Sequence, residues 1–295
     1  MTPDNFLFLC DLLYQRSGLV LSEAKTYLVE ARLTPFVRRL GIGGLDELIR
    51  TVQLKKDEKL IREITDAMTT NESFFFRDGT PFKIFKEDVL PKLLAARSET
   101  KKIRIWSAAC SMGQEPYTIA MLLKEEGAKV RDYRFDIIGT DISDEVLKKA
   151  RDGFYTQFEV QRGLPIQLLV KYFTKEGENR WQICREIREM ITYRYLNLLD
   201  DFSALGPFDV VFCRNVLIYF DQPTKVRVLE RISKIMANDS VLFLGGAETV
   251  IGVTDTFKPV PGARGTYGLA KEGGAVHTKA IGTSVARPPT QPSAS

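Results

Sequence analysis

A run of mostly small residues, Ser107–Pro116, stands between a short apolar stretch and a helical pattern of apolar residues. A loop of this kind lets a ligand approach the backbone N–H groups at the N-terminus of a helix. Gly113 is its only glycine, so the run does not match the Gly-x-Gly-x-x-Gly pattern that binds a dinucleotide pyrophosphate. The carboxylate of Glu115 would repel a phosphate but suits a ligand that carries an amine or a sulfonium. By itself, the run is also compatible with a purely structural turn.

An acidic residue, Asp141, closes the next apolar stretch of the sequence. An acid at the end of the second strand of a doubly wound sheet can accept hydrogen bonds from both ribose hydroxyls of a nucleoside. Asp141 lies 28 residues after Gly113, somewhat beyond the usual spacing of about 20. Asp141 or Ser143 could instead cap the following helix. Taken with the preceding loop, Asp141 predicts a ribose-binding site.

Two further segments carry polar groups that a simple core would not need. Cys213–Phe220 follows a continuous apolar run and places Arg214 and Asn215 before an aromatic pair. The carboxyl ends of the strands in an open α/β sheet face the ligand crevice, so these polar side chains are candidates for binding. Thr69–Asp78 holds three phenylalanines flanked by an amide, a hydroxyl and an arginine. It suits either the roof of a cleft between two domains or an element that only packs the domains together.

The elements that must position these residues change in kind along the chain. Residues 1–75 show apolar positions at helical spacing and no strand pattern, which predicts a small all-α domain. After residue 100, short apolar runs alternate with helical patterns. The expected strands are 103–106, 135–139, 191–198, 208–213, 241–244 and 266–269, with helices from residue 115, over 144–151 and over 226–236. This alternation predicts an α/β domain over residues 76–272 with a doubly wound, mostly parallel, Rossmann-like sheet.

One stretch departs from this alternation. Between Tyr155 and Tyr193, two runs with strand character flank the polar turn Lys175–Asn179, which predicts a hairpin inserted between sheet elements. We therefore expect a β-subdomain insert at about residues 156–193. Residues 273–295 are rich in Gly, Ala, Thr, Ser and Pro and have almost no large apolar side chains, which predicts a disordered tail.

Composition disfavours several kinds of chemistry. The 295 residues include one histidine, His277 in the predicted tail, so a histidine triad, a histidine general base and a histidine metal site are all disfavoured. The four cysteines lie far apart and form no Cys-x-x-Cys pair, so neither a structural zinc nor a disulfide framework is expected. We therefore expect no metal.

Charge and hydropathy bear on the location and the partners. The formal net charge is +4, and the residues after Ala270 carry half of it, which is too mild for a general nucleic-acid binder. No apolar run approaches the length of about 20 residues that spans a bilayer, so no insertion into a membrane is expected. The first residues lack the basic flank of a signal peptide. These features predict a cytoplasmic protein, and we expect a monomer.

Five motifs in a fixed order connect the chain to a known family. They are T-T-N-E-S-F-F-F-R from residue 69, G-Q-E-P-Y from 113, G-T-D-I-S from 139, N-L-L-D from 197 and C-R-N-V-L-I-Y-F from 213. With them the chain, from about residue 4 to residue 270, resembles the CheR-type chemotaxis receptor methyltransferases. That family joins a small helical domain to an S-adenosylmethionine-binding α/β domain with an inserted β-subdomain. The resemblance implies methylation of glutamate side-chain carboxylates on chemoreceptors, in bacterial chemotaxis signalling, with S-adenosylhomocysteine as the product.

Carried over onto the matching positions, the resemblance gives each site residue a role. It implies that Asn197 and Leu198 frame the adenine, Asp141 binds the ribose, Glu115 holds the amino group of the methionine part, and Asn71, Ser73, Arg77, Arg214 and Asn215 line the remaining cofactor site. Arg77 and Tyr219 are the catalytic candidates, because the resemblance places them by the reacting centre and the incoming substrate.

The implied reaction suits a chain without a usable histidine. A glutamate carboxylate has a pKa of about 4.3 and is already ionised at neutral pH, so no general base is needed. The remaining task is to align the carboxylate oxygen with the methyl group and the sulfur of the cofactor. Arg77 and Tyr219 could do this by orienting the carboxylate. Two alternatives stay open: an S-adenosylmethionine-binding signalling module without catalysis, and a nucleic-acid methyltransferase. Against the second, the segment after the fourth expected strand lacks an Asn-Pro-Pro-Tyr pattern.

A basic stripe on the second expected helix indicates how the partner is recognised. Lys25, Arg32 and Arg39 recur every seven residues, and Arg38 lies beside them. Such a stripe could dock on the acidic cytoplasmic helical bundle of a chemoreceptor, and a merely solvated helix face is the alternative. Members of the family that grip a peptide at the receptor's C-terminus carry a longer, glycine-rich loop than Lys175–Asn179. We therefore expect that this protein does not need that peptide.

Overall fold

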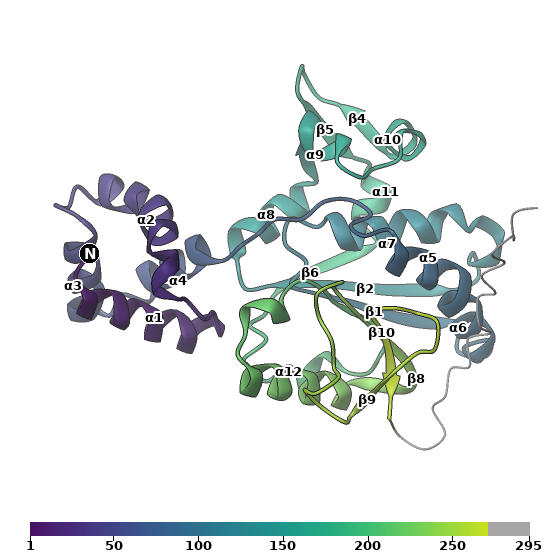
Figure 1. Cartoon of the computed structure of the whole chain (residues 1–295). Helices are drawn as coiled ribbons and strands as arrows, with labels where there is room; N and C mark the ends of the chain where they lie inside the picture. The colour runs from purple at the N-terminus through teal and green to yellow at the C-terminus, as the bar shows by residue number, and fades with distance from the viewer. Residues whose placement is uncertain (271–295) are drawn as a thin grey trace, which may run out of the picture.

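The computed structural model describes residues 1–270 and shows two parts joined by a linker (Figure 1). The tail predicted to be disordered, residues 273–295, lies outside the described residues. Figure 1 shows a small group of helices at the N-terminus beside a larger part in which helices cover both faces of a sheet. Residues 69–79 connect the two parts.

The N-terminal part consists of four α-helices and a short 3-10 turn. They are α1 Pro3–Ser17, the turn η1 Glu23–Lys25, α2 Thr26–Leu40, α3 Leu45–Lys55 and α4 Glu58–Met68. Their apolar faces meet in one core that includes Leu9, Leu13, Leu33, Ile49 and Ile64. Gly18 ends α1 and Gly41 ends α2, each in the left-handed backbone region that glycine adopts without strain, with φ of 72° and 64°. The predicted all-α domain is confirmed.

Seven strands form the main sheet, in the order β6-β2-β1-β7-β8-β10-β9. They are β1 Lys102–Ala108, β2 Arg134–Asp141, β6 Ile191–Tyr195, β7 Phe208–Cys213, β8 Met236–Leu244, β9 Phe257–Pro259 and β10 Thr266–Leu269. The strands from β6 to β8 run parallel, and β10 runs antiparallel to both β8 and β9. The sequence did not predict β9, because three residues are too few to show a period of two.

Helices cover both faces of this sheet. The helical elements are α5 Thr80–Ile84, the π-helical turn η2 Phe85–Val89, α6 Leu90–Ala96, α7 Gln114–Glu125, η3 Gly127–Lys129, α8 Asp144–Asp152, η4 Ser203–Leu205, η5 Leu217–Tyr219 and α12 Gln222–Lys234. Figure 1 shows α5, α7 and α8 on one side and α12 on the other. Neighbouring residues of β1, Ile105 and Trp106, belong to two separate cores, one on each face. Burial on both faces makes the central strands rich in apolar residues, and the predicted doubly wound sheet is confirmed.

Several expected element boundaries differ from the structure, among them the start of β8 at Met236 rather than at Val241, and two of the differences have a clear local cause. β6 ends at Tyr195 rather than at Leu198, because the chain turns there and the N–H of Asp200 bonds back to the carbonyl of Asn197. α12 begins four residues before Val226, because the carboxylate of Asp221 accepts a hydrogen bond from the chain and caps the helix.

A second, smaller sheet forms an insert between α8 and β6 (Figure 1). It contains β3 Phe154–Thr156, β4 Phe173–Lys175 and β5 Arg180–Ile183 in the antiparallel order β3-β5-β4, with the helices α9 Gln157–Gln161, α10 Ile166–Tyr172 and α11 Arg185–Arg188. The predicted hairpin is β4 with β5. The sequence missed β3, which pairs with a strand far along the chain. The insert also ends before residue 193, because Ile191 already begins β6 of the main sheet.

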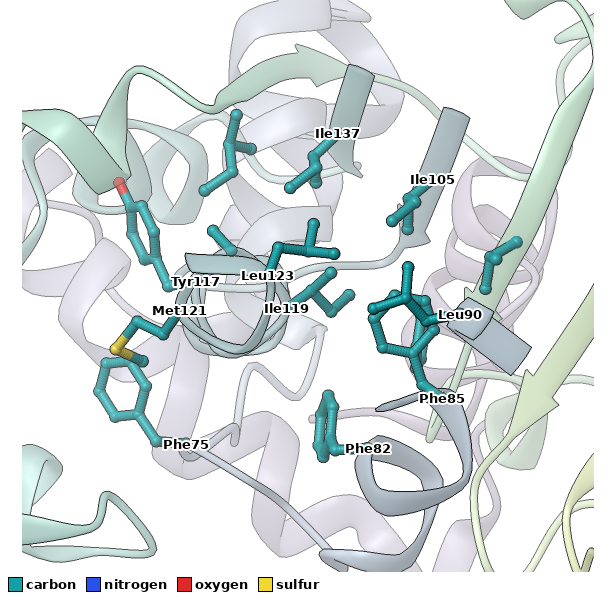
Figure 2. Packing of buried hydrophobic residues seen from close by; sticks show 14 of the residues in the cluster. Phe75, Phe82, Phe85, Leu90, Ile105, Tyr117, Ile119, Met121, Leu123 and Ile137 are labelled. Atoms are coloured by element: carbon teal, nitrogen blue, oxygen red, sulfur yellow. The ribbon is translucent and has the colours of Figure 1, made fainter. Parts of the chain in front are cut away.

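The core above the main sheet anchors the linker (Figure 2). Phe75, Phe82 and Phe85 pack with the apolar side chains of α7 and of the central strands. Phe75 is fully buried, and its ring meets the rings of Tyr155 and Phe173 edge-on, with centroids 5.0 and 5.6 Å away. The middle phenylalanine of the linker is therefore fixed to both the main core and the insert.

Candidate active site

A cleft opens at the carboxyl ends of β1, β2 and β7, between the sheet, the linker and the N-terminal helices. The empty space in it, including the part open to solvent, is about 970 Å³. It is lined by every residue that the sequence assigned to cofactor or acceptor, namely Asn71, Ser73, Arg77, Glu115, Asp141, Asn197, Leu198, Arg214, Asn215 and Tyr219. The sequence did not predict Ser17 and Leu19, which bring the loop after α1 into the same wall.

Asp141 holds its carboxylate at the floor of the cleft. The N–H of Ser111 donates to Oδ2 at 2.8 Å and that of Ser143 to Oδ1 at 3.0 Å, and the residue is only 6% exposed. Burial raises the pKa of Asp141, and the backbone N–H donors oppose that shift. The hydroxyl of Ser143 accepts from the N–H of Val146 and caps α8. The capping role therefore falls to Ser143, which leaves Asp141 available to a ligand.

The loop after β1 depends on residues in the left-handed backbone region. Ala109, Ser111 and Gly113 have φ values of 55°, 51° and 90°. At Gly113, a Cβ atom would lie 2.7 Å from the hydroxyl oxygen of Tyr193, so both the backbone and the space require glycine. These turns bring the loop against β2, where the N–H of Ser111 reaches Asp141.

Arg214 bridges three elements of the cleft. Its guanidinium donates to Oε2 of Glu115 at 2.8 Å, to Oδ2 of Asp78 at 2.7 Å and to the carbonyl of Arg77 at 2.8 Å. The Arg214 side chain is 1% exposed, and the hydroxyl of Ser107 donates to the other carboxylate oxygen of Glu115 at 2.7 Å. Arg214 therefore joins β7, α7 and the linker. Asp78 is a partner that the sequence did not predict, although it directly follows the linker motif.

The linker forms the roof of the cleft, and its residues divide between packing and lining. Phe75 is buried in the core, whereas Asn71, Ser73 and Arg77 line the cleft. The hydroxyl of Ser111 donates to the carbonyl of Asn71 at 2.8 Å and so joins the roof to the floor. The cleft interpretation therefore fits Asn71, Ser73 and Arg77, whereas Phe75 packs within the core of the sheet part and not between the two parts.

Arg77 brings a positive charge to the roof. One of its guanidinium nitrogens donates to the carbonyl of Glu72 at 2.9 Å, and the guanidinium carbon lies 5.4 Å from the ring centroid of Phe74. A guanidinium carries five N–H donors, so these contacts leave donors for a carboxylate ligand.

The N-terminal helices close the remaining side of the cleft. Nδ2 of Asn197 donates to the carbonyl of Arg16 at 2.7 Å, and the N–H of Val20 donates to the carbonyl of Tyr219 at 3.1 Å. Two of the predicted site residues are thus positioned by contacts with the other part of the molecule.

The four basic residues predicted to dock on a receptor do not form one continuous stripe. Lys25 lies in η1, ahead of α2, and both Lys25 and Arg38 are exposed. Arg39 is exposed and forms an ion pair with Glu63. Arg32 instead donates to two backbone carbonyls at the end of α4, at 2.6 and 2.9 Å, because terminal carbonyls have no partner within their own helix. The docking role of Arg32 stays a prediction, and in the structure this half-buried side chain holds the start of the linker.

Three further findings concern metals, membranes and thiols. Within residues 1–270, no group of three or more His, Cys, Asp or Glu side chains is placed to hold a metal ion. Across the same residues, no helix combines the length and the apolar character needed to cross a bilayer. All four cysteines are free thiols. Independence from metal stays a prediction.

Asp66 lies at the end of α4, on the seam between the helices and the sheet. Its Oδ1 is buried and has no hydrogen-bond partner in the described part of the chain. Burial, the largest cause, raises the pKa of Asp66 to about 6, and the carboxylates of Asp144 and Asp141 add to the shift, while Ser143 opposes it. Around pH 5, the folded state therefore keeps a proton that the unfolded chain has mostly released.

Asp66→Asn is expected to stabilise the protein above neutral pH. Because the folded-state pKa is raised, ionisation of Asp66 costs stability as the pH rises through about 6, and the amide avoids that cost. For a half-buried group we expect a gain of about 1 kcal/mol, discounted for solvent screening. Urea unfolding at several pH values measures the gain, which should shrink as the pH falls toward about 4. A gain that is the same at every pH, or equal in the exposed control Asp132→Asn, would contradict this assignment.

The fold and the cleft together define a class of protein. A mostly parallel sheet of this strand order, with an acid after β2 and a small-residue loop after β1, is that of a Rossmann-like methyltransferase, here preceded by an all-α domain. The chain belongs to the CheR methyltransferase family: residues 71–266 match the family's S-adenosylmethionine-binding domain and residues 4–69 its all-alpha domain.

Relatives with established names cover most of the chain. The protein is 40% identical over 258 residues to chemotaxis protein methyltransferase 1 of Pseudomonas aeruginosa, covering 86% of this chain and 93% of that protein. It is 38% identical over 257 residues to chemotaxis protein methyltransferase Cher2 of Pseudomonas putida, with the same shares of 86% and 93%. It is 33% identical over 278 residues to the chemotaxis protein methyltransferase of Salmonella typhimurium, covering 92% of each chain.

Proposed function

We propose that this protein transfers a methyl group from S-adenosylmethionine to glutamate side chains of chemoreceptors, giving glutamate methyl esters and S-adenosylhomocysteine. The observation that carries the proposal is the convergence on one cleft of ten site residues from five separate stretches of the chain. Membership of the CheR methyltransferase family and the names of the relatives support the same conclusion. The methyl esters would adjust receptor signalling during bacterial chemotaxis.

The side chains of the cleft fit S-adenosylmethionine. Asp141 offers carboxylate lone pairs to the ribose hydroxyls, Asn197 and Leu198 offer a polar edge and an apolar surface to the adenine, and Glu115 accepts from the amino group. Asn71, Ser73, Arg77, Arg214 and Asn215 complete the binding set. When bound, the cofactor supplies a methyl group activated by a positively charged sulfur. Two carboxylates and no phosphate-binding glycine pattern suit such a cationic nucleoside.

Arg77 and Tyr219 orient the acceptor carboxylate in this proposal. A glutamate side chain is ionised at neutral pH, since its pKa is about 4.3, so no residue has to remove a proton. The guanidinium of Arg77, set by Glu72 and Phe74, pairs with the carboxylate. The roof keeps water away from the pair, and alignment of the reacting groups supplies the rate enhancement.

The acceptor belongs to the cytoplasmic helical bundle of a chemoreceptor, and the N-terminal helices dock on it. Lys25 and Arg38 are exposed, which supports a role in contacting an acidic partner, and Arg39 beside Arg38 is exposed but already paired with Glu63. The connection between β4 and β5 is short, and the N–H of Glu176 bonds across it to Arg180 at 2.7 Å. We propose that this short turn does not grip a receptor peptide. The protein would act as a monomer in the cytoplasm, without metal, nucleic acid or insertion into the membrane.

Lys25→Glu combined with Arg38→Glu is expected to raise the KM for receptor about tenfold, because two attractions at the rim of the interface become repulsions. The effect should be larger at low ionic strength. The Kd for S-adenosylhomocysteine should stay unchanged, since neither residue lines the cleft. Arg131→Glu, an exposed charge reversal on the sheet part, is the control and should leave the KM unchanged. An equal loss of receptor and cofactor affinity would argue against docking through these residues.

The proposed function is tested by methyl transfer from radiolabelled S-adenosylmethionine to membranes that contain chemoreceptors. Base-labile label on the receptor, absent with Asp141→Ala, is the expected result, because carboxyl methyl esters hydrolyse in base. Cofactor binding without any label would instead favour a binding module without catalysis. Label on nucleic acid rather than on receptor would favour a nucleic-acid methyltransferase.

A further inference from the structure

A buried carboxylate that does not line the cleft organises the loop after β7. Glu248 follows β8 and is 8% exposed. Its Oε2 accepts hydrogen bonds from the N–H of Asn215 at 2.8 Å and of Gly245 at 2.7 Å, and its Oε1 accepts from the N–H of Ile218 at 3.3 Å. Three backbone donors from two loops therefore converge on one side chain.

The segment that receives these bonds carries two site residues in demanding conformations. Asn215 has a φ of 60°, in the left-handed region that a residue with a Cβ atom rarely adopts. Ile218 lies in η5, a turn whose first N–H groups have no partner within it. Tyr219 follows directly. By bonding to the N–H groups of Asn215 and Ile218, Glu248 fixes both ends of the segment that presents Asn215 and Tyr219 to the cleft.

Gly245 shows independently how closely the two loops pack. A Cβ atom at this position would lie 2.7 Å from Nδ2 of Asn215, 2.7 Å from Oε2 of Glu248 and 2.9 Å from the backbone nitrogen of Asn215. Any larger residue at position 245 would have to displace Asn215. The close packing at the end of β8 therefore depends on glycine at position 245 and restricts the position of Asn215.

We propose that Glu248 is a positioning residue for methyl transfer, which sets Tyr219 for the acceptor carboxylate and Asn215 for the cofactor without touching either ligand. The inference rests on the proposed function, because it concerns two residues of the same cleft. The floor is held differently: Asp141 bonds to the N–H groups of Ser111 and Ser143, and Glu248 takes no part. Loss of the Glu248 carboxylate should therefore lower the rate of transfer more than the affinity for the cofactor.

Glu248→Gln tests this inference with little change in size. Both carboxylate oxygens of Glu248 accept from backbone N–H groups, and in glutamine an NH2 group replaces one of them. That NH2 group faces an N–H group, so at least one hydrogen bond becomes a repulsive contact. We expect kcat on receptor-containing membranes to fall about 10- to 100-fold, the effect of leaving buried polar groups unpaired. The Kd of S-adenosylhomocysteine, measured by calorimetry, should rise by no more than about fivefold, because Asn215 is only one of the nine residues assigned to the cofactor. Asp255→Asn removes an exposed carboxylate from the same loop and should keep the wild-type kcat.

A second variant displaces Asn215 by adding a methyl group at position 245 and keeps the carboxylate of Glu248. Gly245→Ala should show the same split, with a kcat that falls by a larger factor than the affinity for S-adenosylhomocysteine. A wild-type kcat in both variants would overturn the proposal. An equal loss of kcat and cofactor affinity would also overturn it, because Glu248 would then support the cofactor site as a whole. Failure of the proposed function looks different, since the wild-type protein itself would bind the cofactor and leave the receptor unlabelled, and the inference would fall with it.

Discussion

Asp141→Ala is expected to weaken the binding of S-adenosylhomocysteine about 10³-fold, which corresponds to about 4 kcal/mol. In the proposed complex the carboxylate accepts from both ribose hydroxyls, and hydrogen bonds to a charged group are worth about 1.5–3 kcal/mol each. The same carboxylate holds the N–H of Ser111, so its loss also loosens the floor of the cleft. Calorimetry measures the affinity. Methyl transfer should be undetectable at cofactor concentrations that saturate the wild type.

A neighbouring acid provides the matched control for this variant. Asp144 is three residues further along, and its side chain is 54% exposed and paired with Arg62. Asp144→Ala removes the same charge from the same region, and its Kd should stay within about threefold of the wild-type value, as expected for a surface ion pair. If Asp141→Ala bound the product as tightly as Asp144→Ala does, the ribose role of Asp141 would be wrong.

Arg214→Met is expected to destabilise the protein by about 3 kcal/mol and to remove most of its methyl-transfer activity, because it leaves the carboxylate of Glu115, whose side chain is only 12% exposed, without its cation. The Arg214 side chain is 1% exposed and bonds to Glu115, to Asp78 and to the linker backbone. Three elements that enclose the cleft lose their common partner in this variant. Urea unfolding measures the stability, and steady-state kinetics on receptor-containing membranes measure the activity.

Two further variants separate the charge of Arg214 from its geometry. Arg214→Lys keeps the positive charge, but a single ammonium does not reproduce the planar fork that reaches three acceptors, so we expect it to recover only part of the activity. A double-mutant cycle with Glu115→Gln should show coupling of about 1–3 kcal/mol, as is usual for residues in direct contact. Additive losses would show that Arg214 acts independently of Glu115.

Local patterns in the sequence were enough for the fold class. The central strands of the main sheet are rich in apolar residues because helices cover both faces, and this makes runs such as Phe208–Cys213, with Asp209 as their one charged residue, visible without any tertiary information. The all-α domain was also visible in the sequence. Each of its helices buries one stripe of apolar side chains, and the spacing of that stripe is a local pattern. β3 and β9 were missed because strands of three residues carry too short a pattern.

The membership of the candidate site also followed from the sequence. The polar side chains of the site follow the carboxyl ends of strands, and in a parallel sheet those ends lie at one edge. Glu115, Asp141 and Asn215 therefore come together as a consequence of the sheet topology. The linker already stood out by its composition, and the resemblance to a known family then added Asn197 and Leu198 after β6.

Only the tertiary structure decided which charges are paired and which face a ligand. Arg214 meets Glu115 across 99 residues of chain and Asp78 across 136, and no local pattern reports contacts over such separations. Arg32 looked like part of an exposed stripe because its helical spacing is right, yet it bonds to the carbonyls that end another helix. Glu248 gave no signal at all, since its partners are backbone N–H groups, which every residue except proline has. The sequence determined the elements and the types of residue at the cleft, whereas long-range packing determined the electrostatic partners that position them.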